Sequence, residues 1–192
     1  MRPLAFDVIH DEHQSLAAML RSMSLLVAQA HREGHAPDFA VLRAMLFYVD
    51  EFPERLHHPK ESQWLFPQVR LRCPELGPTL DRLDADHGRG EAAIRELEHA
   101  LLAYEVLGDR RRQAFVEAME RYIDGYLTHM AVEEREVLPA AIQHLTADDW
   151  ARLDAAFAAN RDPLTGRHEA DTSFRPLFSK ILVTAPAPVG LG

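Results

Sequence analysis

The feature that most constrains the fold is a short pattern that occurs twice, at residues 57–67 and again at residues 129–139. Each stretch reads H-x-x-x-E and then runs through apolar residues to a proline. In a helix, positions i and i+4 lie on one face, so each stretch would present an imidazole beside a carboxylate. Two such pairs on facing helices, with one further histidine from each of two other helices, would make a site for two metal ions.

Composition limits the class of protein. The chain has 192 residues, of which 47% are hydrophobic, so it can bury a sizeable core in one compact soluble domain. Its net charge of −9 argues against a nucleic-acid-binding protein, which would carry a basic face. The same charge disfavours attraction to anionic membranes.

The sequence also indicates a compartment. Cys73 is the single cysteine, so no internal disulfide can form. No apolar run approaches the ~20 residues needed to span a bilayer. Asp7 comes before any apolar run has built up, unlike the start of a signal peptide. We therefore expect a cytoplasmic protein.

Helical periodicity covers most of the chain. Apolar residues recur at helical spacing in four long segments, and we expect Pro53 and Pro59 to bend or briefly break the second of them. Four amphipathic segments with short links predict an all-α fold, an antiparallel (up-down-up-down) four-helix bundle. The segments span about residues 5–33, 38–72, 75–107 and 109–144.

The remaining residues predict a short extension. Thr146, with Asp149 three residues later, forms a variant of the capping box that opens a short helix. A second small helix is expected to dock at residues 174–182. The predicted organisation is therefore a bundle at residues 1–145, a C-terminal helical extension packed on it at 146–184, and a disordered tail at 185–192.

Four histidines fall on the inward stripes, one in each long segment, and three of them have a glutamate at i+4. A lone histidine on an apolar stripe is most often a core residue with one hydrogen bond. Buried carboxylates, however, are costly unless they are paired or bind a metal. The predicted metal ligands are His13, His57, Glu61, His87, Glu91, His129 and Glu133.

The ligand types limit the metal. Imidazole and carboxylate suit Fe, Mn or Zn, and the set contains no thiolate. Two divalent ions would have most of their charge cancelled by two or three carboxylates and a bridging hydroxide, whereas one ion would leave several ligands idle. Other polar side chains near the pattern are predicted to lie on solvated faces: His58, His99, Glu134 and Glu136.

With these residues identified, the chain resembles the hemerythrin-like family, the HHE cation-binding domain, and looks like its bacterial stand-alone members. The matching features are Asp11-Glu12-His13, residues 57–67, His87 in mid-helix and residues 129–139. The resemblance implies a non-haem di-iron centre with a bridging oxo or hydroxo group, in which Zn or Mn could substitute. Its bridging carboxylates would be Glu61 and Glu133, and its terminal ligands His13, His57, His87 and His129.

The chain departs from the oxygen-carrying members of that family. They have H-x-x-x-H on the third helix, where this chain has Glu91, and they have an aspartate bridge one residue beyond the position of Glu133. A more carboxylate-rich site could favour oxidation of the iron over reversible oxygen binding. The implied roles are binding of O2 or NO, or sensing or buffering of iron or redox state, by a monomer or homodimer.

Two other functions fit parts of the pattern. A ferritin-like di-iron oxidase or peroxidase uses E-x-x-H pairs, and Glu54 with His57 and Glu96 with His99 have that spacing, although His99 lies off the predicted core stripe. A metal-free helical interaction module could use its exposed helices or residues 174–182, but the inward acids argue against it.

Overall fold

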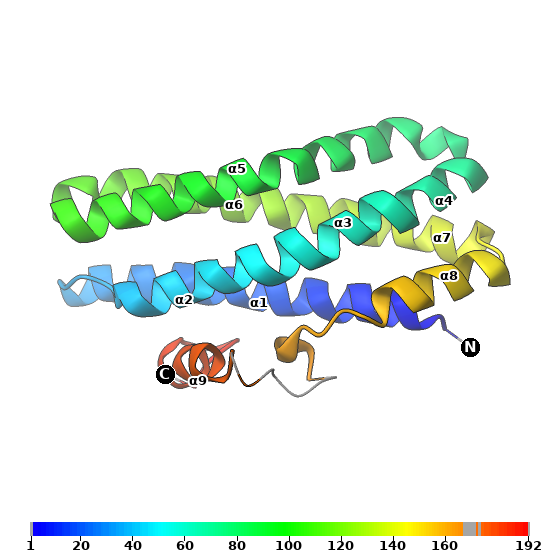
Figure 1. Cartoon of the computed structure of the whole chain (residues 1–192). Coiled ribbons are helices and arrows are strands. Elements are labelled where there is room, and N and C mark those ends of the chain that lie inside the picture. Colours follow the sequence, from blue (N-terminus) through cyan, green and yellow to red (C-terminus); the bar gives the residue numbers. More distant parts are fainter. Residues whose placement is uncertain (1, 167–171, 173, 192) are drawn as a thin grey trace.

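The structure is a computed structural model that describes residues 2–166, 172 and 174–191. Within these residues the chain forms helices and no strand, as the all-α prediction requires. Figure 1 shows long helices that lie side by side in an elongated bundle. The α-helices are α1 (Leu4–Glu33), α2 (Phe39–Val49), α3 (His58–Lys60), α4 (Phe66–Arg72), α5 (Gly77–Leu107), α6 (Arg112–Val132), α7 (Leu138–His144), α8 (Ala147–Phe157) and α9 (Arg175–Thr184).

The ends of the long helices follow from local sequence. Gly34 ends α1 in the left-handed region at φ 75°, which glycine adopts at no steric cost. Asp38 caps α2 by accepting a hydrogen bond from the backbone N–H of Val41. Gly108, at φ 77°, separates α5 from the next helical turn. The predicted boundaries of the long segments therefore agree closely with the helices, apart from the interruptions between α2 and α4 and between α6 and α7.

These interruptions are π-helical segments at Asp50–His57 (η1), Glu61–Leu65 (η2) and Glu133–Val137 (η5). Each ends in a backbone bond from residue i to residue i−5, donated by the residue directly before a proline. Proline has no N–H and cannot continue the usual bonding, so the wider turn accommodates it. The expected break at the prolines is therefore a local widening, and the helix axis continues.

The core has two hydrophobic clusters with a polar layer between them. On α1, Ile9 belongs to one cluster and Leu16 to the other, and His13 lies between them. On α5, Leu83 and Ile94 divide in the same way on either side of His87. The inward histidines therefore occupy a layer that interrupts the core at one level along the bundle.

The C-terminal extension packs along the bundle. α8 begins with the predicted capping box, in which Thr146 and Asp149 exchange hydrogen bonds, and it lies beside α1 (Figure 1). The described part of the predicted tail, residues 185–191, lies against α1, where the Ser22 hydroxyl donates to the Pro186 carbonyl. Ala185 is fully buried and anchors this stretch in the core. Across the described residues, no helix is both long and apolar enough to cross a membrane.

Candidate metal centre

The centre is built from two histidine pairs that face one another across the bundle. His13 from α1 and His57 from η1 bring their Nε2 atoms to 3.2 Å. His87 from α5 and His129 from α6 bring theirs to 2.9 Å. Nitrogens that bind one ion at adjacent positions, each ~2.1 Å from it, lie about 3 Å apart. Each pair therefore has the spacing of two ligands to one cation.

Two buried carboxylates lie between the pairs. Glu61 Oε1 is 3.2 Å from His57 Nε2, and Glu61 Oε2 is 3.5 Å from His87 Nε2. Glu133 Oε2 is 3.3 Å from His13 Nε2, and Glu133 Oε1 is 3.2 Å from His129 Nε2. Each carboxylate thus turns one oxygen to each histidine pair, which is the arrangement of a group that bridges two cations.

All four oxygens of Glu61 and Glu133 are buried, and none has a hydrogen-bond partner among the described residues. A buried carboxylate without a hydrogen bond is costly, and metal coordination is one of the few ways to compensate for it. The nitrogen and oxygen donors suit Fe, Mn or Zn. The residues present therefore fit a centre for metal cations.

The second nitrogen of each histidine faces an acceptor. His57 Nδ1–H donates to Glu12 Oε2 at 2.6 Å, and His13 Nδ1–H donates to Glu134 Oε1 at 3.2 Å. On the other pair, His87 Nδ1 is 2.9 Å from Ser62 Oγ, whereas His129 Nδ1 has no hydrogen-bond partner among the described residues and lies 3.5 Å from Asp86 Oδ2. In the neutral imidazoles of His57 and His13, the carboxylate contacts place the proton on Nδ1 and leave the Nε2 lone pair for a metal, as metal-bound histidines require.

The charges of the metal-free site are uneven. Burial would lower the pKa of His13, but the carboxylates of Glu133 and Glu134 outweigh it and raise that pKa to about 9. Burial and the charge of His58 together lower the pKa of His87 to about 2. Burial and the nearby Glu133 raise the pKa of Glu61, whereas His129 and His13 hold the pKa of Glu133 well below its usual range despite burial. A cation entering the site must therefore displace protons.

The two histidine pairs have different surroundings. On the side of His13 and His57, which we call the closed side, the free space is only about 10 Å³. Residues after α8 cover this side, because Asn160 donates to Glu12 Oε2 at 2.9 Å and accepts a hydrogen bond from Lys60.

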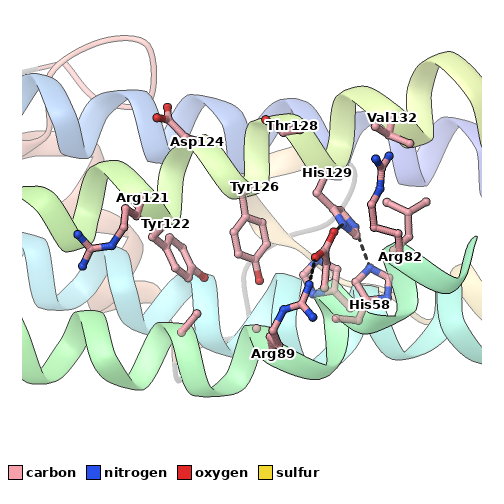
Figure 2. A pocket seen from close by; sticks show the side chains of 16 residues that line it. His58, Arg82, Arg89, Arg121, Tyr122, Asp124, Tyr126, Thr128, His129 and Val132 are labelled. Carbon is pink, nitrogen blue, oxygen red and sulfur yellow. Dashed lines mark hydrogen bonds and ion pairs between the residues drawn. The ribbon is translucent and has the colours of Figure 1, made fainter. Parts of the chain in front are cut away.

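On the side of His87 and His129, which we call the open side, a cavity of about 490 Å³ lies between α5 and α6. Figure 2 shows Tyr122, Tyr126 and His129 projecting from α6 into this cavity, with Arg89 opposite.

Six of the seven predicted ligands come together in this centre: His13, His57, Glu61, His87, His129 and Glu133. Glu91 does not join them. Its side chain is 66% exposed and pairs with Arg95, so the prediction that it faces inward is wrong. The inward position of that turn of α5 belongs to Gly90, which is buried against Glu54.

Two polar residues, His58 and Glu134, were wrongly predicted to be solvated. His58 is buried, stacks on His87 with ring centroids 4.3 Å apart, and contacts Glu54. Glu134 is only about one-third exposed and contacts His13. The sequence does contain one signal for His58, because Glu54 and His58 are themselves an i, i+4 pair. The pairing of His58 with Glu54 on one face is as the spacing predicts, but the π-helical turn η1 precedes His58, and the shared face lies inward and not in solvent.

Comparison with known proteins agrees with this geometry. The family model of the hemerythrin HHE cation-binding domain matches residues 4–141. The chain belongs to this hemerythrin family. It is also 27% identical over 159 residues to an uncharacterized protein of Haemophilus influenzae, a match that covers 81% of this chain and 88% of the relative. No solved structure matches the chain.

Membership of this family implies cation binding, and the clustered histidines and glutamates of this hemerythrin-family chain fit that activity. They come from four helical segments that are far apart in the sequence, and nearly all of them are buried.

Proposed function

We propose that this chain is a non-haem di-iron protein of hemerythrin type. In this proposal α1, the α2–α4 segment, α5 and the α6–α7 segment are the four antiparallel helices of the bundle. His13 and His57 hold one ion, His87 and His129 hold the other, and Glu61 and Glu133 bridge them. Iron bound by such ligands supplies redox chemistry and affinity for small molecules.

The observation that carries this proposal is the set of four buried carboxylate oxygens without a hydrogen-bond partner, between two pairs of converging histidine nitrogens. A polar core without metal would instead be expected to satisfy such oxygens with donors. The even division of the oxygens between the two pairs supports two ions rather than one.

Any ligand of the closed side must be very small, and we infer a diatomic such as O2 or NO. The space there of about 10 Å³ is close to the ~10–15 Å³ that a single water needs. Binding of such a ligand would let the protein carry it, or sense oxygen, nitric oxide, iron or redox state.

The test is elemental analysis of protein made in iron-supplemented cells. Wild-type protein should hold about two irons per chain. Glu61→Ala and His129→Ala should lose the iron, because each removes a donor that is shared or paired. His99→Ala is the matched control, since His99 is exposed on α5 away from the centre. Stoichiometric iron in both ligand variants would refute the proposal.

An oxidase or peroxidase is the second function to separate. Its predicted E-x-x-H pair at Glu96 and His99 is not brought to the centre, because both residues are exposed. A visible spectrum that appears with oxygen and reverses on degassing supports a carrier or sensor. Turnover of hydrogen peroxide that depends on His99 would support the enzyme.

A further inference from the structure

We propose that His58 is a third nitrogen donor to the cation held by His87 and His129. This inference rests on the proposed two-cation function and deepens it, because it makes the two ions chemically unequal. No position of the repeated H-x-x-x-E pattern assigns a role to His58.

The position of His58 supports this role. One nitrogen from each of His58, His87 and His129 lies within 4.8 Å of the others. Two nitrogens that bind one ion at ~2.1 Å each can be separated by at most about 4.2 Å. Because adjacent ligands of one ion lie about 3 Å apart, side-chain shifts of up to about 1–2 Å would bring all three nitrogens onto one cation. The imidazole rings of His58 and His87 are stacked, with centroids 4.3 Å apart and planes at 15°, so the His58 ring must tilt for both lone pairs to converge on the ion.

The orientation of His58 points the same way. His58 Nδ1 is 3.3 Å from Glu54 Oε2, so an Nδ1–H can donate to this carboxylate. The other ring nitrogen, Nε2, is then free to bind a metal. This is the same division of roles that the contact with Glu12 imposes on His57.

Glu54 is itself held in place. The hydroxyl of Tyr122 donates to Glu54 Oε1 at 3.1 Å, and the hydroxyl of Tyr126 donates to the same oxygen. The carboxyl group packs directly against Gly90, where a Cβ would overlap it. Two hydroxyl donors and a glycine therefore fix one carboxylate, and that carboxylate orients His58.

His58 also lies between the large cavity and the centre. It lines the 490 Å³ cavity together with His87 and His129. Figure 2 draws His58 and His129 among the residues that line this cavity. As a ligand, it would complete the open side with three nitrogens and two bridging oxygens. The closed side would have only two nitrogens and the bridges, so its ion would have the more vacant coordination position.

The test is a titration of metal-free protein with cobalt(II), whose visible absorption reports the number and type of its ligands. Wild-type protein and the control His99→Ala should bind two equivalents with the same spectrum. His58→Ala should bind one equivalent as before and the second at least tenfold more weakly, with an altered spectrum. Two equivalents of unchanged affinity and spectrum in His58→Ala would overturn the inference. A wild-type protein that binds no metal would instead refute the proposed function itself.

A second set of variants keeps the imidazole of His58 in place. Glu54→Gln and Tyr126→Phe loosen the support of His58 and should weaken binding of only the second equivalent of metal, by tenfold or more for Glu54→Gln.

Rescue by free imidazole is a further test. Free imidazole should restore binding of the second equivalent in His58→Ala, because the cavity beside it is wide enough to admit the ring. It should not restore binding in His57→Ala, which borders only the small space of the closed side. Equal binding of both equivalents in Glu54→Gln, or no rescue by imidazole, would contradict the inference.

Discussion

The closed and open sides of the centre use the same ligand types but enclose them differently. On the closed side, residues after α8 cover the histidines, and Asn160 supports the Glu12 carboxylate that orients His57. On the open side, a cavity reaches the histidines, and the supports are Ser62 and a longer contact to Asp86. The difference teaches that the space through which a ligand reaches an ion and the number of coordination positions left open on that ion are separate properties. The side with more space around it is also the side where a further nitrogen, from His58, is available.

The largest expected effect comes from removing the metal, because both sides share the bridging acids. A ligand that binds only the native state stabilises it, by about 4 kcal/mol for each site at a thousandfold excess over Kd. Metal-loaded wild-type protein should therefore melt at a clearly higher temperature than protein treated with a chelator.

The matched control for metal removal is Glu133→Gln, which loses a bridge common to both sides. Chelation should leave its melting temperature unchanged. Equal melting temperatures of loaded and chelated wild-type protein would show that no cation stabilises the fold, and would remove the basis for comparing the two sides.

The next effect concerns the cover of the closed side. Asp162 is buried, accepts a hydrogen bond from the Tyr48 hydroxyl at 2.6 Å, and burial raises its pKa to about 6. The unfolded chain would release this proton near pH 4. Between pH 4 and pH 6 the unfolded state therefore loses its proton first, and the folded state loses relative stability. The total loss is about 3 kcal/mol, at ~1.4 kcal/mol for each tenfold change in acidity.

Asp162→Asn removes the titrating carboxyl group, so this loss of stability between pH 4 and pH 6 should disappear. In metal-free protein, the stability of the variant relative to wild type should rise from pH 4 to pH 6 and level off above. Urea unfolding at several pH values measures this difference, in which the titration of all other groups is common to both proteins. A difference that stays constant over this range would contradict the assigned pKa.

Much of this centre was predictable from the sequence because regular helical spacing places His13, Glu61, His87 and Glu133 on inward faces. Residues i and i+4 share a face in any regular helix, so this part of the site depends only on local helical geometry. The ends of the long helices were equally predictable, since Gly34 and Gly108 adopt backbone conformations that favour glycine.

The errors arise where the helix departs from regular spacing or where distant segments meet. A π-helical turn precedes His58, which faces inward. A regular period of 3.6 residues does not predict where such a turn occurs. Glu91 has the right spacing, but the contact between Gly90 and Glu54 occupies the inward position of its turn. Asn160 reaches the closed side only through tertiary packing, which no local pattern encodes.

A smaller effect would sharpen the difference in ligand support. Substitution of a residue that orients a metal-bound histidine typically costs 10–100-fold in metal affinity. Glu12→Gln should cost this much at the closed side, because its contact to His57 is short, at 2.6 Å. Asp86→Asn should cost less at the open side, where the contact to His129 is 3.5 Å. Competition with a chelator of known affinity measures both, and an equal or larger loss in Asp86→Asn would reverse the assignment of the better-supported side.

The smallest effect compares two glycines of α5. A Cβ at Gly88 meets nothing within 4 Å, so Gly88→Ala should stabilise the helix by about 0.5–1 kcal/mol. A Cβ at Gly90 would overlap the carboxyl group of Glu54. Gly90→Ala gains the same helix propensity but must displace Glu54, at a cost of about 1–3 kcal/mol. It should therefore be neutral or destabilising by about 1–2 kcal/mol in urea unfolding.

The difference in stability between Gly88→Ala and Gly90→Ala is the informative quantity, because the two positions share one helix and one substitution. If Gly90→Ala stabilised the protein as Gly88→Ala does, Glu54 would be free to move, and nothing would hold His58 in a fixed orientation on the open side. If it destabilised the protein and also weakened the second equivalent of metal, the glycine, the glutamate and the histidine would form one supporting chain. The open side would then be as closely built around its ion as the closed side, through different residues.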